Sequence, residues 1–192
     1  MENRVSEPVR IIRSLPETGR PRIIAIDGRC ASGKTTLAEQ LREVLDCTVI
    51  HMDEFFLRPE QRTQERLRTA GGNVDYERFL TEVLSPLREG TVFAYRPYDC
   101  KRQALAEPIR IVPGELALVE GSYSCHPALW DAYDLRIFLT VEPQEQLRRI
   151  RKRNGEQAAE IFLKKWIPME ELYFSAFQIE SRCDLHYKIA QA

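Results

Sequence analysis

The sequence predicts an α/β fold, with a central parallel β-sheet between two layers of helices. Four nearly continuous apolar runs have the length and composition of strands that are buried on both faces: residues 23–27, 47–52, 116–121 and 135–141. The segments between them place many of their apolar residues at helical spacing. Because strands and helices alternate along the chain, we expect a single domain that spans residues 1–192.

The two ends of the chain fit the same scheme. Residues 1–22 are expected to form an N-terminal helix and a linker that prolines and a glycine interrupt. Residues 156–181 are expected to be helical with a break at Pro168, and Leu172 and its aromatic neighbours are expected in the core. Residues 185–189 are predicted to form a short last strand.

A glycine-rich turn follows the first predicted strand. Residues 28–35 read GRCASGKT and match the phosphate-binding pattern G-x-x-x-x-G-K-[ST]. Glycines allow backbone angles at which several N–H groups point at one anion, and the helix that follows adds its positive end. The sequence therefore predicts a nucleoside triphosphate site in a three-layer P-loop NTPase fold.

Each residue of this loop has an expected task. Lys34 supplies a mobile charge for the outer phosphates, and the Thr35 hydroxyl is suited to Mg²⁺. The residues expected to contact the nucleotide are Gly28, Ala31, Ser32, Gly33, Lys34, Thr35 and Thr36. The expected cofactors are therefore ATP and Mg²⁺. Cys30 lies near a helix N-terminus and invites a redox hypothesis, with a merely tolerated small residue as the alternative.

Two acidic residues stand at the ends of predicted strands. Ligands of open α/β sheets bind beyond the carboxyl ends of the strands, which is where Asp53 and Glu120 occur. A carboxylate at the end of a buried strand is costly without a task, so Glu120 is predicted to help hold Mg²⁺. A turn or capping role is the alternative for both residues.

Two arginine-rich segments are candidate lids. Residues 143–158 are predicted to form a lid helix whose basic cluster, including Arg149 and Arg153, stabilises charge on the transferring phosphoryl group. A solvated charged face is the alternative. Residues 57–73 are interpreted as a mobile loop or lid near the acceptor, and a simple solvated loop explains them equally well.

A few further residues could face an acceptor. Asp75 begins a predicted helix, so capping alone would justify it, while a contact with substrate is the functional interpretation. Tyr95, Tyr98 and Arg102 could line a pocket for a base or sugar, or they could be ordinary half-buried loop residues.

Composition excludes several classes of protein. The chain has 28 basic and 29 acidic residues and a net charge of −1, which argues against nucleic acid or an anionic membrane as a partner. No apolar run approaches the ~20 residues of a membrane-spanning helix, and residues 1–10 lack the apolar core of a signal peptide. The five cysteines form no C-x-x-C pair, so neither a disulfide framework nor a zinc site is expected, and a cytoplasmic location is the simplest.

With these segments in place, the chain resembles the uridine kinase family of P-loop small-molecule kinases, and more distantly phosphoribulokinase and type I pantothenate kinase. The resemblance covers residues 20–155 and follows the family order of segments: GRCASGKTT, MDEFF, NVDYERF, YRPYDCKR, LVEGSY, DLRIFLTV and RRIRKR. Members of this family are often oligomeric, so a homo-oligomer is one expectation.

The resemblance implies roles for individual residues. It makes Asp53 the acceptor of the hydroxyl proton, Thr35 and Glu120 the Mg²⁺ positions, with Asp53 close to the metal, and Arg149 and Arg153 lid residues. The implied acceptor-binding residues are Asp53, Phe56, Asp75, Tyr98, Arg102 and Gln103. Phe56 stands where the family usually has tyrosine, and Gln103 stands near where it has a histidine that reads the pyrimidine.

The predicted function is therefore transfer of the ATP γ-phosphoryl group to a hydroxyl of a small molecule, with a nucleoside as the expected acceptor. The departures at Phe56 and Gln103 leave uridine specificity open. One alternative is a kinase of another small alcohol, such as pantothenate. Another is a nucleotide-binding regulatory protein, although no N-K-x-D guanine signature occurs in the chain.

Overall fold

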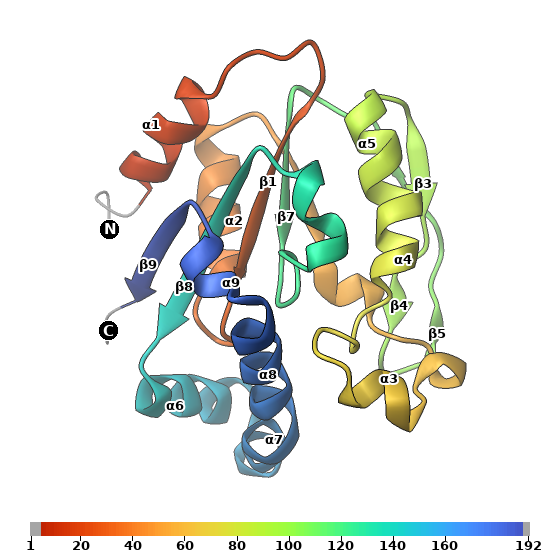
Figure 1. Ribbon diagram of the computed structural model, residues 1–192, viewed down its shortest axis with the longest axis vertical. Coiled ribbons are helices and arrows are strands. Elements are labelled where there is room, and N and C mark those ends of the chain that lie inside the picture. Colours follow the sequence, from red (N-terminus) through yellow and green to blue (C-terminus); the bar gives the residue numbers. More distant parts are fainter. Residues whose placement is uncertain (1–4, 190–192) are drawn as a thin grey trace.

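The computed structural model describes residues 5–189 (Figure 1). Its main sheet is parallel and has the strand order β2-β7-β1-β8-β9. These strands are β1 (Arg22–Gly28), β2 (Thr48–His51), β7 (Leu116–Glu120), β8 (Leu135–Val141) and β9 (Leu185–Ile189). The prediction of an α/β fold around a covered parallel sheet is confirmed.

The central strand β1 is buried along almost its whole length and divides the core in two. Ile24 and Ile26 point to one face, where they contact α1 (Ser6–Ser14) and α2 (Lys34–Val44). Ile23 and Ala25 point to the other face. This alternation follows from the two-residue period of a strand, and it explains why the strand is apolar at every position rather than at every second one.

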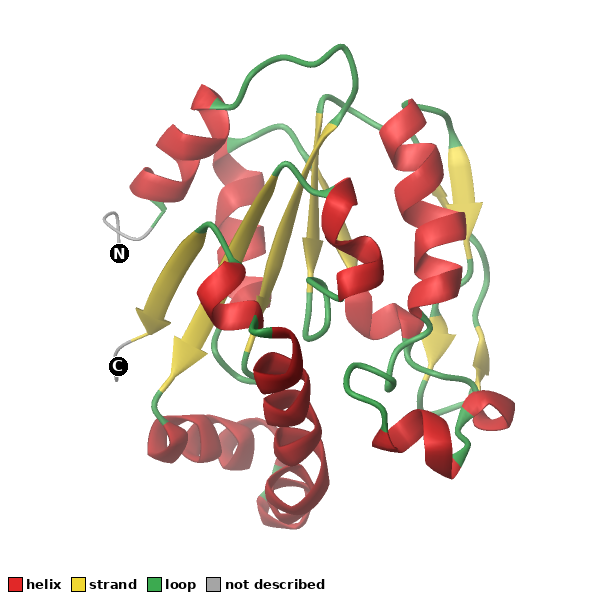
Figure 2. Cartoon of the chain, in the orientation of Figure 1, coloured by secondary structure: helices red, strands yellow, loops and turns green. Residues whose placement is uncertain are grey.

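The second face of the sheet is covered by segments from distant parts of the chain (Figure 2). They are α4 (Tyr76–Phe79), the π-helical turn η3 (Leu80–Leu84), α5 (Ser85–Glu89), the 3₁₀ segment η4 (Pro127–Ala132), α8 (Ile167–Phe177) and α9 (Ile179–Arg182). Phe79 of α4 and Tyr173 of α8 are fully buried there. This layer holds most of the aromatic core.

The carboxyl edge of the sheet collects the loops that carry polar residues. The turn after β1 leads into α2, and β2 is followed by the 3₁₀ segment η1 (Met52–Phe55). β8 leads into α6 (Pro143–Asn154), which is followed by α7 (Glu156–Ile161). Because parallel strands end at the same edge, residues that are far apart in sequence meet there.

Outside the main sheet lie two antiparallel ribbons. β3 (Phe93–Tyr95) pairs with β6 (Ile109–Ile111), and β4 (Tyr98–Asp99) pairs with β5 (Ala104–Leu105). The segment predicted as a loop, residues 57–73, contains the 3₁₀ turn η2 (Pro59–Gln61) and α3 (Gln64–Arg68). This segment therefore contains short helical turns that the sequence analysis did not predict, and its role as a lid stays a prediction.

Two expectations for the C-terminal third are wrong. The helix does not break at Pro168: α7, the π-helical turn η5 (Phe162–Trp166) and α8 follow one another without a gap, and Pro168 stands at the junction of η5 and α8, where the hydrogen-bonding pattern changes. Leu172 is 46% exposed rather than in the core. Within residues 5–189, no helix has both the length and the apolar character needed to cross a membrane.

Candidate active site

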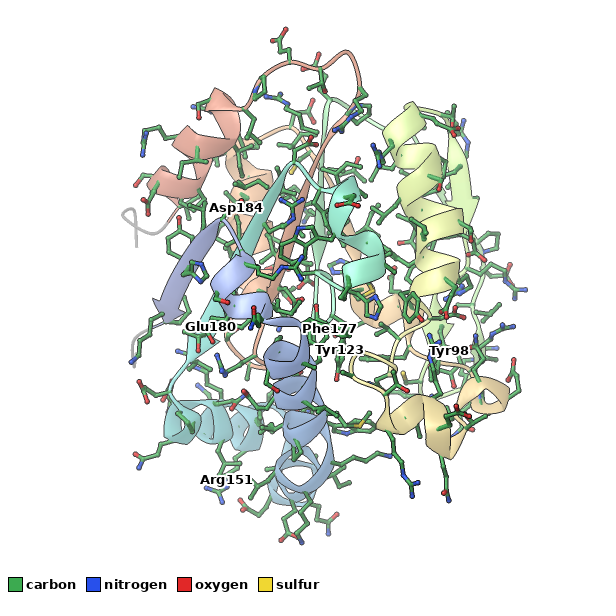
Figure 3. All side chains as sticks on the ribbon, in the orientation of Figure 1. Tyr98, Tyr123, Arg151, Phe177, Glu180 and Asp184 are labelled. Atoms are coloured by element: carbon green, nitrogen blue, oxygen red, sulfur yellow. The ribbon has the colours of Figure 1, made fainter. Side chains whose placement is uncertain are left out.

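A cavity of about 700 Å³ opens at the carboxyl edge of the sheet. The wall is formed by the loop after β1, the segment that follows β2, the end of β7, α6 and η5, among others. Tyr123 belongs to this wall, and Figure 3 shows it close to Phe177, at the end of α8, whereas Tyr98 lies on the side of β4. The cavity is therefore built from the same strand ends at which the sequence predicted chemistry.

The phosphate-binding loop depends on its two glycines. Gly28 has φ +135°, and a Cβ atom there would lie 2.0 Å from the carbonyl oxygen of Leu139. Gly33 has φ +99° and stands immediately before α2, with open space where its Cβ would be. The first glycine therefore permits close packing of the loop on β8, and the second permits the turn into the helix.

Lys34 is buried at the centre of the loop. Its Nζ donates to the carbonyl oxygens of Gly28, at 2.7 Å, and Arg29, at 3.0 Å. The ammonium group is thus held against the backbone that would surround the phosphates of a nucleotide. Ala31, Gly33, Thr35 and Thr36 also line the cavity, while Ser32 is fully buried.

The oxygen ligands at this edge fit a bound Mg²⁺ nucleotide. The Thr35 hydroxyl donates to the Glu120 carboxylate at 3.1 Å. Hydroxyl and carboxylate oxygens are the hard ligands that Mg²⁺ prefers. The hydroxyl of Ser32 is buried and has no hydrogen-bond partner among the described residues, so the loop retains polar capacity beside the expected phosphates. Within residues 5–189, there is no cluster of three histidine, cysteine or acidic side chains that would form a separate metal centre.

His51 is a site residue that the sequence did not predict. Its Nδ1 lies 2.6 Å from Oε1 of Glu120, because the two residues are directly paired at the ends of β2 and β7. The hydrogen bond to Glu120 raises the pKa of His51. A histidine two positions before Asp53 and at the end of a predicted strand was the signal that could have identified it.

Asp53 lies in η1, beside the end of β7. Its side chain is exposed to the cavity but otherwise surrounded by protein, and a Cβ on Gly121 would lie 3.3 Å from its Oδ1. This enclosure raises the pKa of Asp53; Lys34 opposes the rise and Glu120 adds to it. An acidic side chain with a raised pKa, open to a cavity, is suited to accepting a proton.

The two predicted lid arginines both line the cavity. Arg149 donates to Glu145 at 2.7 Å and to the carbonyl oxygen of Ala31 at 3.3 Å, so it is positioned against the phosphate-binding loop. Arg153 is exposed near the end of α6, and Lys165 of η5 adds a further positive charge to the wall. Arg151, in contrast, points away from the centre of the molecule (Figure 3).

Helix α8 contacts the loop at its variable positions. Glu170 is 5% exposed; it accepts from the backbone N–H of Cys30 at 3.0 Å and from the Ser122 hydroxyl at 2.7 Å. Arg29 forms an ion pair with Glu171 at 2.7 Å. Burial raises the pKa of the Cys30 thiol to about 12, so the thiol stays protonated and the geometry gives the redox hypothesis no support.

Asp27 anchors the loops on either side. Its carboxylate is fully buried and accepts four hydrogen bonds, from the N–H groups of Gly28, Tyr123 and Cys125 and from the hydroxyl of Tyr173. Burial raises its pKa to about 6 despite these donors. Asp27 therefore fixes the relative positions of the phosphate-binding loop and the loop after β7.

The residues predicted to bind the acceptor are not all brought together. Phe56 lines the cavity with Asp53. Asp75 is buried as the N-cap of α4 and accepts from the side chain of Gln61, so it has the capping role that the sequence left open. Tyr98, Arg102 and Gln103 are also absent from the cavity wall: Tyr98 is buried, and the other two are exposed. Arg62 and Cys100, which the sequence did not single out as acceptor-site residues, do line it.

Comparison with known proteins bears on the family resemblance that the sequence predicted. No protein-family model matches the chain. Uridine kinase-like protein 3 of Arabidopsis thaliana is 29% identical over 157 residues, which are 76% of this chain and 33% of the relative. The predicted resemblance to the uridine kinase family is confirmed. The chain spans about a third of the length of this curated relative.

Two solved structures share the fold. A possible uridine kinase from Bacillus stearothermophilus superposes with a TM-score of 0.73 and 19% identity, over 97% of this chain and 98% of the other. A protein from a Silicibacter species, provisionally assigned as a fructose transport system kinase, gives a TM-score of 0.69 and 21% identity, over 94% and 96%. At these identities the similarity establishes the P-loop NTPase fold and nothing finer.

Proposed function

We propose that this protein is a small-molecule kinase that transfers the γ-phosphoryl group of ATP to an alcohol. The observation that carries the proposal is the meeting of Lys34, Asp53 and the Thr35–Glu120 pair around one cavity at the end of β1. These residues supply, in order, a charge for the phosphates, a base for the acceptor and oxygen ligands for a divalent cation.

The proposed step breaks the bond between the γ-phosphorus and the oxygen that bridges it to the β-phosphate. A new bond forms between that phosphorus and the acceptor oxygen, and ADP leaves. The hydroxyl proton passes to the carboxylate of Asp53, which the structure leaves open to the cavity. Asp53 also orients the hydroxyl, so catalysis depends mainly on positioning and electrostatics.

Positive charge around the phosphates comes from both sides of the cavity. Lys34 approaches from the loop, and Arg149 and Arg153 approach from α6. Thr35 and Glu120 would hold Mg²⁺, which neutralises phosphate charge when it is bound. His51 is hydrogen-bonded to Glu120 and would keep that carboxylate in place.

The acceptor is the open part of the proposal. The sequence predicts a nucleoside, and the name of the Arabidopsis relative supports that choice. Of the six residues implied to bind it, Asp53 and Phe56 line the cavity. Another small alcohol is the main alternative, and a nucleotide-binding regulator is the second.

The test is ADP release from Mg-ATP in the presence of uridine, cytidine, pantothenate and other small alcohols, with a control that lacks acceptor. The proposal expects one acceptor to stimulate release strongly and to appear as its phosphate ester. Asp53→Asn should bind ATP normally and lose the stimulation. Nucleotide binding without stimulation by any acceptor would instead favour the regulator, and unchanged turnover of the variant would remove Asp53 from the mechanism.

A further inference from the structure

The acceptor side of the cavity contains a fixed positive charge, Arg62. This residue follows η2 and lines the cavity together with Phe56 and Leu57. Its Nε donates to the carbonyl oxygen of Leu57 at 2.9 Å, and its Nη2 donates to the hydroxyl of Tyr98 at 3.1 Å. The guanidinium carbon also lies 5.6 Å from the centre of the Tyr98 ring. These contacts hold the group in one orientation.

Arg62 differs from its neighbours in having no acidic partner. Arg58 forms an ion pair with Glu60, and Arg66 forms one with Glu77. Within residues 5–189, no carboxylate oxygen lies within 4.0 Å of Arg62. Two of its five N–H groups have protein acceptors, so the others remain available, and the fork of a guanidinium matches a carboxylate or phosphate.

Arg62 lies on the same wall as the proposed base. Cys100, which also lines the cavity, is close enough to both residues to respond to their charges: burial raises the pKa of its thiol, Arg62 opposes the rise, and Asp53 adds to it. The phosphate side of the cavity already has Lys34, Arg149 and other cations. A further cation on the cavity wall, close to the same thiol as Asp53, therefore serves the acceptor better than the nucleotide.

We propose that the acceptor is a small alcohol that also carries an anionic group, a carboxylate or a phosphate, which Arg62 binds while Asp53 takes the proton of the hydroxyl. The inference rests on the proposed kinase function and narrows its substrate class. A neutral nucleoside such as uridine then lies outside the preferred class of acceptor, because the charged guanidinium of Arg62 contributes little binding free energy with a neutral partner. Charge-assisted, bidentate hydrogen bonds are stronger than neutral ones.

The test compares pairs of acceptors that differ in the anionic group: D-glycerate with glycerol, pantothenate with pantothenol, and fructose 6-phosphate with fructose. ADP release is measured with and without each compound, and the product is identified by ³¹P NMR. We expect the anionic member of at least one pair to have a kcat/KM about tenfold or more above its neutral partner, and above uridine and cytidine. Glycerate and pantothenate are carboxylates and fructose 6-phosphate is a phosphate ester, so the comparison also shows which of the two anionic groups the site prefers.

Variants then test the residue. Arg62→Gln should raise KM for the anionic acceptor by about ten- to hundredfold and leave KM for ATP little changed. It should also reduce the ratio of kcat/KM between the anionic acceptor and its neutral partner. Arg62→Lys keeps the charge and should retain part of the preference. Arg68→Gln is the matched control, because Arg68 belongs to the neighbouring α3 and does not line the cavity.

The outcomes separate this inference from the kinase proposal. Strong stimulation by a neutral nucleoside, with no anionic acceptor preferred, would overturn the inference and uphold the kinase. A rise in KM for ATP rather than for the acceptor in Arg62→Gln would also overturn it, since Arg62 would then serve the nucleotide. A third outcome would overturn both proposals: no compound stimulates ADP release, and none changes the fluorescence of Trp166 when it is added to the complex with a non-hydrolysable ATP analogue.

Discussion

Replacing Glu170 tests whether α8 holds the phosphate-binding loop. This carboxylate accepts two hydrogen bonds, from the N–H of Cys30 and the hydroxyl of Ser122, and it is 5% exposed. Glu170→Ala removes both bonds: the buried N–H of Cys30 loses its acceptor, and the Ser122 hydroxyl keeps only the longer bond to the carbonyl oxygen of Gly28, at 3.4 Å. Hydrogen bonds to charged groups contribute about 1.5–3 kcal/mol each. Water from the adjoining cavity can solvate part of the gap, so the expected loss is about 2–4 kcal/mol.

The assay is equilibrium unfolding in urea, followed by circular dichroism. With an m-value of about 2 kcal/mol per molar, the midpoint should fall by about 1–2 M in Glu170→Ala. The midpoint of Glu170→Gln should fall by less than that of Glu170→Ala, because the amide oxygen can accept one of the two hydrogen bonds. The amide NH₂ group faces the other donor and cannot accept from it. The m-value should stay constant in both variants.

A matched control is Glu160→Ala, since Glu160 is exposed on α7 and, among the described residues, its ion pair is with Lys164. Exposed pairs contribute less than about 1 kcal/mol, so the midpoint should move by less than ~0.5 M. If Glu170→Ala moved the midpoint no further than this control, the two buried hydrogen bonds would not stabilise the loop and the reasoning would be refuted.

Four further predictions concern the site itself. The surroundings of Asp53 raise its pKa, and the base must be ionised to accept a proton. As the pH is lowered, kcat/KM should therefore begin to fall at a pH above the ordinary pKa range of aspartate. A fall that begins only at or below that range would contradict this prediction. Glu120→Gln should weaken Mg²⁺ by about 10- to 100-fold in a metal titration of activity, with nucleotide binding in EDTA unchanged. Gly28→Ala should lower the free energy of unfolding by about 3 kcal/mol or more, since its Cβ would overlap the Leu139 carbonyl; a stable variant would argue against the close packing. Cys30 should resist iodoacetamide in the folded protein at pH 8, and rapid mass-detected labelling would contradict its raised pKa.

The parts of the fold that the sequence predicted well depend on local pattern. β1 and β8 are buried on both faces, so their apolar runs could be recognised from the sequence alone. The glycine-rich turn could be recognised because it matches a defined motif between a strand and a helix. The strands β3, β4 and β5 were not predicted, because strands of two or three residues carry too short a pattern. Pro168 was misleading because its effect depends on whether it begins a helical turn or interrupts one.

The site was predictable where topology alone determines position. Asp53 and Glu120 follow strands of one parallel sheet, so the strand ends bring them together whatever the intervening residues are. Asp75 was assigned to acceptor binding by resemblance, yet its side chain caps the N-terminus of α4. Arg62 belongs to the arginine-rich segment 57–73, and the feature that distinguishes it there, the lack of an acidic partner among residues 5–189, is reported by no sequence pattern.

Helix α8 holds two of the variable positions of the phosphate-binding loop, Arg29 through its side chain and Cys30 through its backbone N–H. The motif prescribes two glycines, a lysine and a threonine, and leaves Arg29 and Cys30 undefined. In the structure these two positions are bound by Glu171 and Glu170.

Tyr173, one turn further along α8, binds the residue before the loop, Asp27. Residues 27, 29 and 30 are thus bound by residues 173, 171 and 170 of α8, about 140 positions later in the chain. In the sequence, the signal of these contacts was a pair of acidic residues close to a tyrosine on a helix that faces the core. Exchanging the loop for that of another P-loop protein should therefore lower stability unless α8 is exchanged with it. A double-mutant cycle between Arg29 and Glu171 would measure that dependence directly, because the coupling energy is zero if the two segments are independent.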